Sequence, residues 1–296
     1  MQTTRTESTP DPGGQTPLEE LFLLRLRYRE GRLVELGANK PFQLDDPETA
    51  WVVYAGKVDI FVVSLHNGEV VGPRRHLLRA EAGQAFFSIG RMDAEGGIGL
   101  LAVGVGGTRV LRVKRERLQE FAANPAHRQE VVALLDVWVN ALGRIAASTL
   151  PPKDCELLDP ETEVTFGPNV SACARRDVVW IRCTEGTATF LGREDLPAMD
   201  GETRLPLSKQ TFIRTLSITK LDTIGTEAYA SQDTAWQALD QFHALVLTCI
   251  RLQAHERERA EQVRLESKAE ADRRGVQRTL SELVSILQPR QERPFD

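Results

Sequence analysis

The sequence has few residues of the kinds that build catalytic or metal centres. Its five histidines are scattered, and none forms a His-x-His pair followed by a Glu and a later His. It contains no His-Glu-x-x-His or Gly-x-Ser-x-Gly motif and no Walker A sequence. We therefore expect a non-enzymatic chain that holds no metal and no cofactor.

Cysteine pairs at metal-binding or redox spacing are also absent. The four cysteines show no Cys-x-x-Cys spacing and lie in strand-like or helix-like apolar settings: Cys155, Cys173, Cys183 and Cys249. Such a pattern predicts buried free thiols in a reducing compartment, and hence a cytoplasmic location.

Excess charge of one sign and long apolar runs are missing as well. The formal net charge is -5 over 296 residues, which argues against a nucleic-acid partner. The longest apolar stretch, 98–105, is about half the ~20 residues that a membrane helix needs. Residues 1–16 have no apolar core, so they resemble a disordered tail rather than a secretion signal.

What the sequence does contain begins with a short helix and a β-rich segment. Residues 17–31 begin with a Pro and two acids and continue with Leu and Tyr at helical spacing, a pattern that predicts a helix. The spacing of β-rich runs then predicts strands at 33–36, 51–54, 57–65, 75–79, 85–89, 98–103 and 108–113. A hairpin turn is predicted at Asn67-Gly68. Residues 115–149 have helical spacing with a break at Asn124-Pro125.

Residues 153–230 are predicted to repeat this β-rich segment. Gly56 aligns with Gly186 in a strand–turn–strand pattern. Two further matches follow in order, Gln84-Ala85-Phe86 with Gln210-Thr211-Phe212 and Gly107-Thr108 with Gly225-Thr226. The expected architecture is mainly β with α: two tandem β-rolls with flanking helices.

A long helix is predicted from Thr234 almost to Leu287. An apolar stripe marks its first four turns, and a densely charged stretch follows. Apolar spacing returns at Val276, Leu280 and Leu283. The first part is expected to pack on the second β-roll, the middle to be solvated, and the end to offer a contact for a partner or a homodimer.

Two strand–Gly–strand rolls that each end in a helix resemble cyclic-nucleotide-binding (cupin-like) domains. In that family a Gly-Glu pair opens a phosphate-binding cassette, whose Glu binds the ribose and whose Arg, about eight residues later, neutralises the cyclic phosphate. Gly83, Gln84 and Arg91 occupy these places here and are the candidate ligand-binding residues. Gln84 lacks the charge, and in the second copy Arg214 follows Lys209-Gln210 too early. The resemblance implies the fold more than the ligand.

A second resemblance covers nearly the whole chain. The phrases LDDPETAWVVYAGKVDIFVV (44–63) and LLRAEAGQAFFSIG (77–90), with the charged helix that contains AEADRR, are similar to the amino-terminal region of bacterial ABC transporters. These transporters belong to natural-product (bacteriocin) clusters whose peptides carry nitrile-hydratase-type or Nif11-type leaders. The resemblance implies a regulatory, docking or cargo-recognition role in peptide export. Its partners would be a protein or leader peptide and the membrane and ATPase domains of the same transporter.

The expected domains are a tail at 1–16, a first β-roll with helices at 17–150, a second β-roll at 151–233, a long helix at 234–288 and a tail at 289–296. Two other interpretations stay open at this point. One is a free-standing cyclic-nucleotide sensor with its ligand near Gln84 and Arg91, and the other is a structural oligomerisation module.

Overall fold

The computed structural model of the chain describes residues 17–29, 32–37, 40–89, 97–147, 151–199, 201 and 204–287. Candidate residue Arg91 and the predicted tails lie outside these residues. The chain divides into two units, Met1–Cys249 and Ile250–Asp296.

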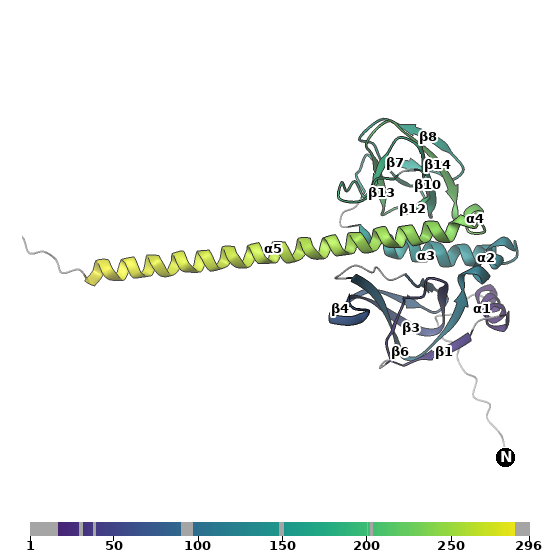
Figure 1. Cartoon of the computed structure of the whole chain (residues 1–296), viewed down its shortest axis with the longest axis horizontal. Coiled ribbons are helices and arrows are strands. Elements are labelled where there is room, and N and C mark those ends of the chain that lie inside the picture. Colours follow the sequence, from purple (N-terminus) through teal and green to yellow (C-terminus); the bar gives the residue numbers. More distant parts are fainter. Residues whose placement is uncertain are drawn as a thin grey trace, which may run out of the picture. The chain divides into compact units, whose positions relative to one another are not determined.

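The first β-region is one antiparallel sheet of six strands built around its central strand, β3 (Figure 1). Its elements are α1 (Pro17–Arg29), β1 (Arg32–Leu36), β2 (Phe42–Gln43), β3 (Thr49–His66), β4 (Glu69–Glu81), β5 (Ala85–Phe87) and β6 (Gly97–Lys114). β3 pairs with β4, β5 and β6. Its long apolar run is buried at Val52, Val58 and Ile60, as expected of a central strand. Asn67 and Gly68 both have positive φ angles, which confirms the predicted hairpin turn.

The second β-region consists of two four-stranded sheets. One has the order β12-β10-β14-β8 and the other β11-β13-β9-β7. The strands are β7 (Glu156–Leu158), β8 (Glu163–Phe166), β9 (Ser171–Ala174), β10 (Val179–Glu185), β11 (Ala188–Phe190), β12 (Leu205–Leu207), β13 (Phe212–Thr215) and β14 (Thr219–Gly225). Trp180, Phe190 and Ile213, on β10, β11 and β13, are buried. All four cysteines are free, but Cys155 is only partly buried, contrary to the prediction, because it precedes β7 at the edge of its sheet.

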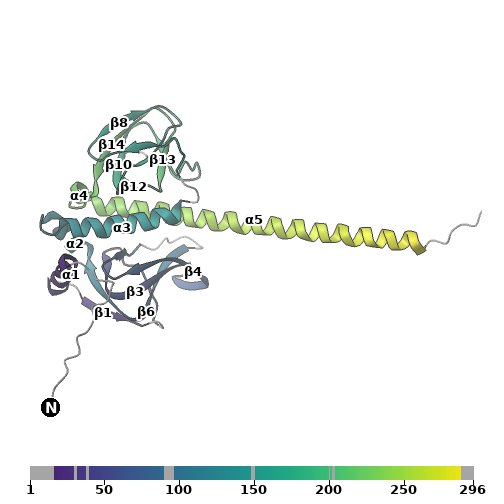
Figure 2. The same ribbon diagram turned by 180° about the vertical axis from the view of Figure 1, so that it is seen from behind.

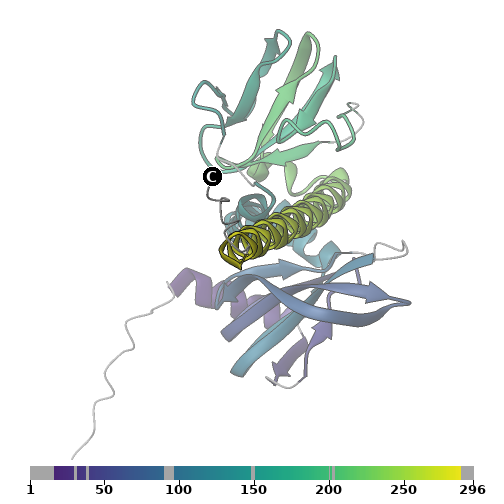
Figure 3. The ribbon, with the colours of Figure 1, turned by 90° about the vertical axis from the view of Figure 1, so that its left-hand side faces the viewer.

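The helices are α2 (Arg115–Ala123), α3 (Arg128–Ala146), α4 (Thr226–Tyr229) and α5 (Thr234–Leu287). The predicted break between α2 and α3 is present at Asn124, whose Oδ1 accepts a hydrogen bond from the backbone N of Ala126 at 3.0 Å. α3 and the first turns of α5 lie between the two β-regions in all three views (Figures 1, 2 and 3). The mainly β fold class with helices and a long C-terminal helix, predicted from the sequence, is confirmed.

Gly56 and Gly186 share a left-handed backbone conformation, but only Gly186 lies in a bend between two strands. The turn predicted at Gly56 is wrong, because Gly56 lies at a bulge inside the continuous strand β3. Their φ angles are +84° and +78°. A Cβ at Gly56 would lie 2.7 Å from Thr108 Oγ1, and a Cβ at Gly186 would lie 2.9 Å from Thr219 Oγ1. Each threonine hydroxyl donates to the carbonyl of the residue that follows its glycine, Lys57 or Thr187. This shared geometry supports the predicted duplication.

The other two sequence matches are wrong. The sequence matched Thr108 with Thr226, but the structural equivalent of Thr108 is Thr219. Thr108 and Thr219 each contact the glycine of their own β-region, and each lies seven residues before the start of a helix. Phe86 pairs with Trp51, in the part of β3 that precedes Gly56, whereas Phe212 pairs with Cys173 of β9. By strand pairing, β5 therefore corresponds to β12, which pairs with the strand before Gly186. Recurring Gly and Phe residues matched by chance because the strand spacing differs between the copies.

The first part of α5 carries the predicted apolar face. Leu239, Phe242 and Val246 are buried, and the Phe242 ring meets Phe190 of β11 edge-on, with 6.3 Å between centroids. In the second unit, the described side chains of residues 255–283 are exposed. Ion pairs such as Arg264–Glu261 run along this stretch. Among the described residues, no helix is long and apolar enough to cross a membrane.

Candidate functional site

The candidate residues Gly83 and Gln84 form the tight turn between β4 and β5. Gly83 has a φ of +84°, and its N donates to the carbonyl of Val53 at 2.9 Å. Val53 N in turn donates to the carbonyl of Gln84 at 2.9 Å. The Gln84 side-chain oxygen accepts a hydrogen bond from Glu81 N at 3.0 Å. Gln84 therefore uses its side-chain oxygen to stabilise its own turn.

The segment that follows β5 differs sharply between the two β-regions. Nine residues, 88–96, separate β5 from β6, and the candidate Arg91 belongs to this segment. The corresponding β12 and β13 are separated by only four residues, 208–211. A cassette that wraps a phosphate needs several backbone N–H groups and an Arg, so the second β-region has no room for one.

The four-residue turn of the second β-region is closed by its own hydrogen bonds. Ser208 N donates to Thr211 Oγ1 at 2.8 Å, and both side chains are buried. Helix α3 packs directly on this turn, since a Cβ at Gly143 would lie 2.9 Å from Thr211 Cγ2. Arg214, two residues into β13, is exposed. The turn is a helix-packing surface and not a ligand site.

A buried guanidinium connects the first β-region to α5. Arg115, the first residue of α2, is 3% exposed. Its Nη2 donates to the carbonyl of Ser88 at 2.7 Å, immediately after β5, and its Nη1 donates to Asp240 Oδ1 at 2.6 Å. The guanidinium also lies over the Trp236 ring, 5.6 Å from its centroid. Sequence reasoning missed this connection, because no spacing signal links residues 125 positions apart.

His243 extends this cluster to α3. Its Nε2 accepts a hydrogen bond from Trp138 Nε1 at 2.8 Å, so the proton of the neutral ring lies on Nδ1. Nδ1 faces Asp240 Oδ1 at 3.7 Å, too far for a hydrogen bond. Complete burial lowers the pKa of His243 to about 4. Burial opposes ionisation of Asp240, but His243 and Arg115 hold the pKa of that carboxyl below its usual value.

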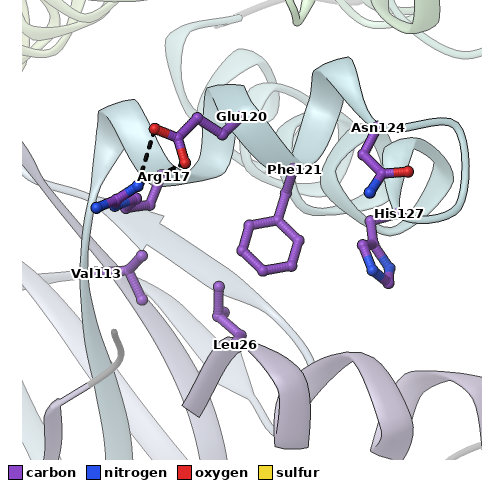
Figure 4. Close-up of a pocket in the computed structure, with 7 residues that line it drawn as sticks. All are labelled: Leu26, Val113, Arg117, Glu120, Phe121, Asn124 and His127. Carbon is purple, nitrogen blue, oxygen red and sulfur yellow. Dashed lines mark hydrogen bonds and ion pairs between the residues drawn. The ribbon is translucent and has the colours of Figure 1, made fainter. Parts of the chain in front are cut away.

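A small cavity of about 170 Å³ lies between α1 and α2 (Figure 4). It is lined by Leu26, Val113, Arg117, Glu120, Phe121, Asn124 and His127. Arg117 and Glu120 pair with each other at its rim, at 2.7 and 2.9 Å. Its volume is below the roughly 300 Å³ at which ligand pockets begin, so it is too small for a nucleotide. Among the described residues, no group of three His, Cys, Asp or Glu side chains could hold a metal ion.

Comparisons with known proteins give structural neighbours only. No protein-family model and no curated protein sequence matches this chain. The catabolite activator protein of Thermus thermophilus is 25% identical, with a TM-score of 0.28 over 46% of this chain and 66% of that one. The chain thus spans just under two thirds of that protein.

Two further neighbours are a CooA mutant of Carboxydothermus hydrogenoformans and cAMP-bound PfPKA-R. The first is 17% identical with a TM-score of 0.29, over 44% of this chain and 85% of that one. The second is 11% identical with a TM-score of 0.27, over 80% of this chain and 95% of that one.

Proposed function

We propose that this chain is a non-catalytic regulatory region of a peptide-exporting ABC transporter, which recognises a protein or leader peptide and signals through α5. The observation that carries the regulatory part is the contact of the buried Arg115 with Ser88 and Asp240. The transporter part rests on the sequence resemblance over 44–63 and 77–90. A cytoplasmic location, next to the membrane and ATPase domains of the same transporter, follows from this proposal.

The Arg115 contact is suited to signalling because the guanidinium is buried and has two specific partners. A guanidinium that loses one partner inside a protein remains a desolvated charge, so the contact resists being broken. A shift of the backbone at Ser88 therefore alters the stability of the Arg115–Asp240 pair. Asp240 lies on α5, so the shift reaches the helix that also carries Trp236 and Phe242, which contact Arg115 and Phe190.

A cyclic-nucleotide sensor is the second candidate function. The nine-residue segment after β5, which contains Arg91, favours it, because the segment has the length that a phosphate cassette needs. The use of Gln84 within its own turn counts against it. The ligand of this alternative would bind in the first β-region alone.

Calorimetry and hydrogen exchange on the full chain test the proposal. Synthetic leader peptides of the nitrile-hydratase and Nif11 types are titrated in one series, and cAMP and cGMP in another. We expect a leader peptide to bind and to change amide protection in residues 234–249. Asp240→Asn should leave binding intact but reduce that change, since the charge of the pair is lost while its shape remains.

Asp195→Asn is the matched control, because its side chain is 45% exposed against 46% for Asp240 and it also pairs with an arginine. Binding of cyclic nucleotides but no leader peptide would replace the proposal with the sensor function. Self-association without binding of either would favour an oligomerisation module. Peptide binding with unchanged protection of 234–249 would overturn the signalling route.

A further inference from the structure

One face of α3 separates two cavities of different chemistry. A polar cavity of about 1190 Å³ lies between α3 and loops of the second β-region, and an apolar cavity of about 610 Å³ lies between α3, α1 and the Gly83 turn. Gln129, Ala133 and Val137 line both cavities. These three residues are spaced four positions apart, so they lie on one face of α3, and all three are exposed. We call this row of side chains the ridge. Because the ridge borders both cavities, the two cavities are continuous and form one groove across α3.

The apolar half of the groove has a hydrophobic floor. Phe22 and Leu23 of α1 and Leu134 of α3 line it, and each is less than 5% exposed. Val137 at its edge is 41% exposed, the kind of exposed valine that a partner could cover. A few apolar side chains of a ligand would fill this space.

The polar half has unbalanced negative charge. Five carboxylates and three guanidiniums line it. Two of the guanidiniums are already engaged: Arg175 pairs with Asp159, and Arg128 donates to the carbonyl of Ala122. Within the part of the chain that the structure describes, Asp136 and Asp177 pair with no arginine or lysine, and the Asp136 carboxylate accepts a hydrogen bond from the Thr226 hydroxyl alone, at 2.6 Å. This half of the groove therefore complements a cation.

Asp136 is the best-placed group to receive that cation. Burial raises its pKa to about 7, and the charge of Asp177 contributes to the increase. Its second oxygen remains available to a ligand, since Thr226 Oγ1 donates to Oδ1. Thr226 is held in place by Trp180 Nε1, which donates to its hydroxyl at 3.0 Å. A positively charged group beside Asp136 would compensate its desolvated charge.

We propose that the groove across α3 binds an amphipathic peptide, with apolar side chains in the Phe22–Leu134 half and a Lys or Arg side chain beside Asp136. The proposal rests on the peptide-recognition function above and specifies the chemistry and place of the peptide. Helix-in-groove recognition commonly uses apolar anchors at helical spacing, and the exposed ridge offers a contact line of that kind.

Fluorescence anisotropy on the full chain tests this placement. The probes are two labelled helical peptides with identical Leu and Phe positions, one with Arg and the other with Glu on its polar edge. We expect the Arg peptide to bind at least tenfold more tightly than the Glu peptide. Asp136→Asn should bring the two affinities to within about threefold of each other.

Val137→Gln and Val105→Gln form the matched pair for the apolar half. The two valines are 41% and 42% exposed, but Val105 lies on β6, away from the lining residues. Val137→Gln should weaken the Arg peptide at least fivefold, and Val105→Gln should leave it unchanged. Equal binding of both peptides, or equal effects of both valine variants, would overturn the groove and leave leader-peptide binding standing. Absence of binding by these probes and by the leader peptides would overturn both proposals.

Discussion

The indole N–H of Trp138 donates to Nε2 of His243 at 2.8 Å, and both side chains are at most 1% exposed. This bond joins α3 to α5 inside the core of the first unit. It also fixes His243 as an acceptor, so the ring must stay neutral with its proton on Nδ1. Protonation would place a charge near Arg115 on a fully buried ring.

His243 should make the protein sensitive to acid. Its folded pKa is about 4, below the ordinary value of 6.5, so the unfolded chain binds the additional proton between these values. The neutral His243 ring therefore contributes up to about 3 kcal/mol to the free energy of unfolding above pH 6.5, and this contribution is lost as the pH falls toward 4. Urea unfolding of wild type and His243→Gln at pH 4.5 and 7.5 measures it. Gln retains an acceptor for Trp138, and identical pH dependence in both proteins would contradict the assignment.

Asp136 should have the opposite effect on stability. Its folded pKa of about 7 lies above the ordinary 3.8, so stability is lost as pH rises from about 4 to 7. The groups that face it are the Thr226 hydroxyl and Asp177, with Arg128, Arg175, Arg176, Asp159, Glu161 and Glu227 around the same cavity. Asp136→Asn should raise the free energy of unfolding by about 1–3 kcal/mol at pH 8 and little at pH 4. Asp195→Asn is the control. A stabilisation of equal size in that variant would show that the effect does not come from the burial of the Asp136 carboxyl.

The core of α5 and its charged stretch should respond very differently to mutation. Phe242 is fully buried against Phe190, so Phe242→Ala should lower the free energy of unfolding by about 3–5 kcal/mol. Glu261 is exposed and paired only with Arg264, so Glu261→Ala should leave the melting temperature unchanged. Thermal melts of both variants provide the comparison. An equally destabilised Glu261→Ala would show that this stretch of α5 packs against another surface.

The sequence predicted individual helices and turns better than it predicted which residues of the two β-regions correspond to each other. The Asn-Gly signal and helical spacing located the hairpin after β3 and the break at Asn124, because these depend on local residues. The Gly residues wrongly divided two strands: predicted strands 51–54 and 57–65 are one strand, β3, and 98–103 and 108–113 are one strand, β6. The match of Phe86 with Phe212 failed because strand pairing is a long-range property, and four residues after β12 replace nine after β5. The Arg115–Asp240 pair was not predictable, since neither residue carries a local signal for burial.

Cyclic nucleotides should bind weakly at most. The first β-region offers a candidate Arg91 but uses Gln84 within its own turn, and the second closes its shorter turn with Ser208 and Thr211. We expect no dissociation constant below about 10 µM, which corresponds to roughly -7 kcal/mol. Calorimetry with cAMP and cGMP measures this. A tighter constant that is lost in Arg91→Ala would place a functional site in the first β-region.

The far end of α5 should mediate association and not folding. Val276, Leu280 and Leu283 are 50–60% exposed, and their spacing of four and three residues forms one stripe. Burial of such side chains against a second copy stabilises by about 1.5–3 kcal/mol each, which is enough for a weak homodimer. Leu283→Ala should therefore shift sedimentation toward the monomer while the melting temperature at low concentration stays the same. Gln277→Ala, an exposed change on another face of the same helix, should alter neither measurement. If Leu283→Ala lowered the melting temperature of the monomer instead, this end of α5 would serve the fold of its own chain.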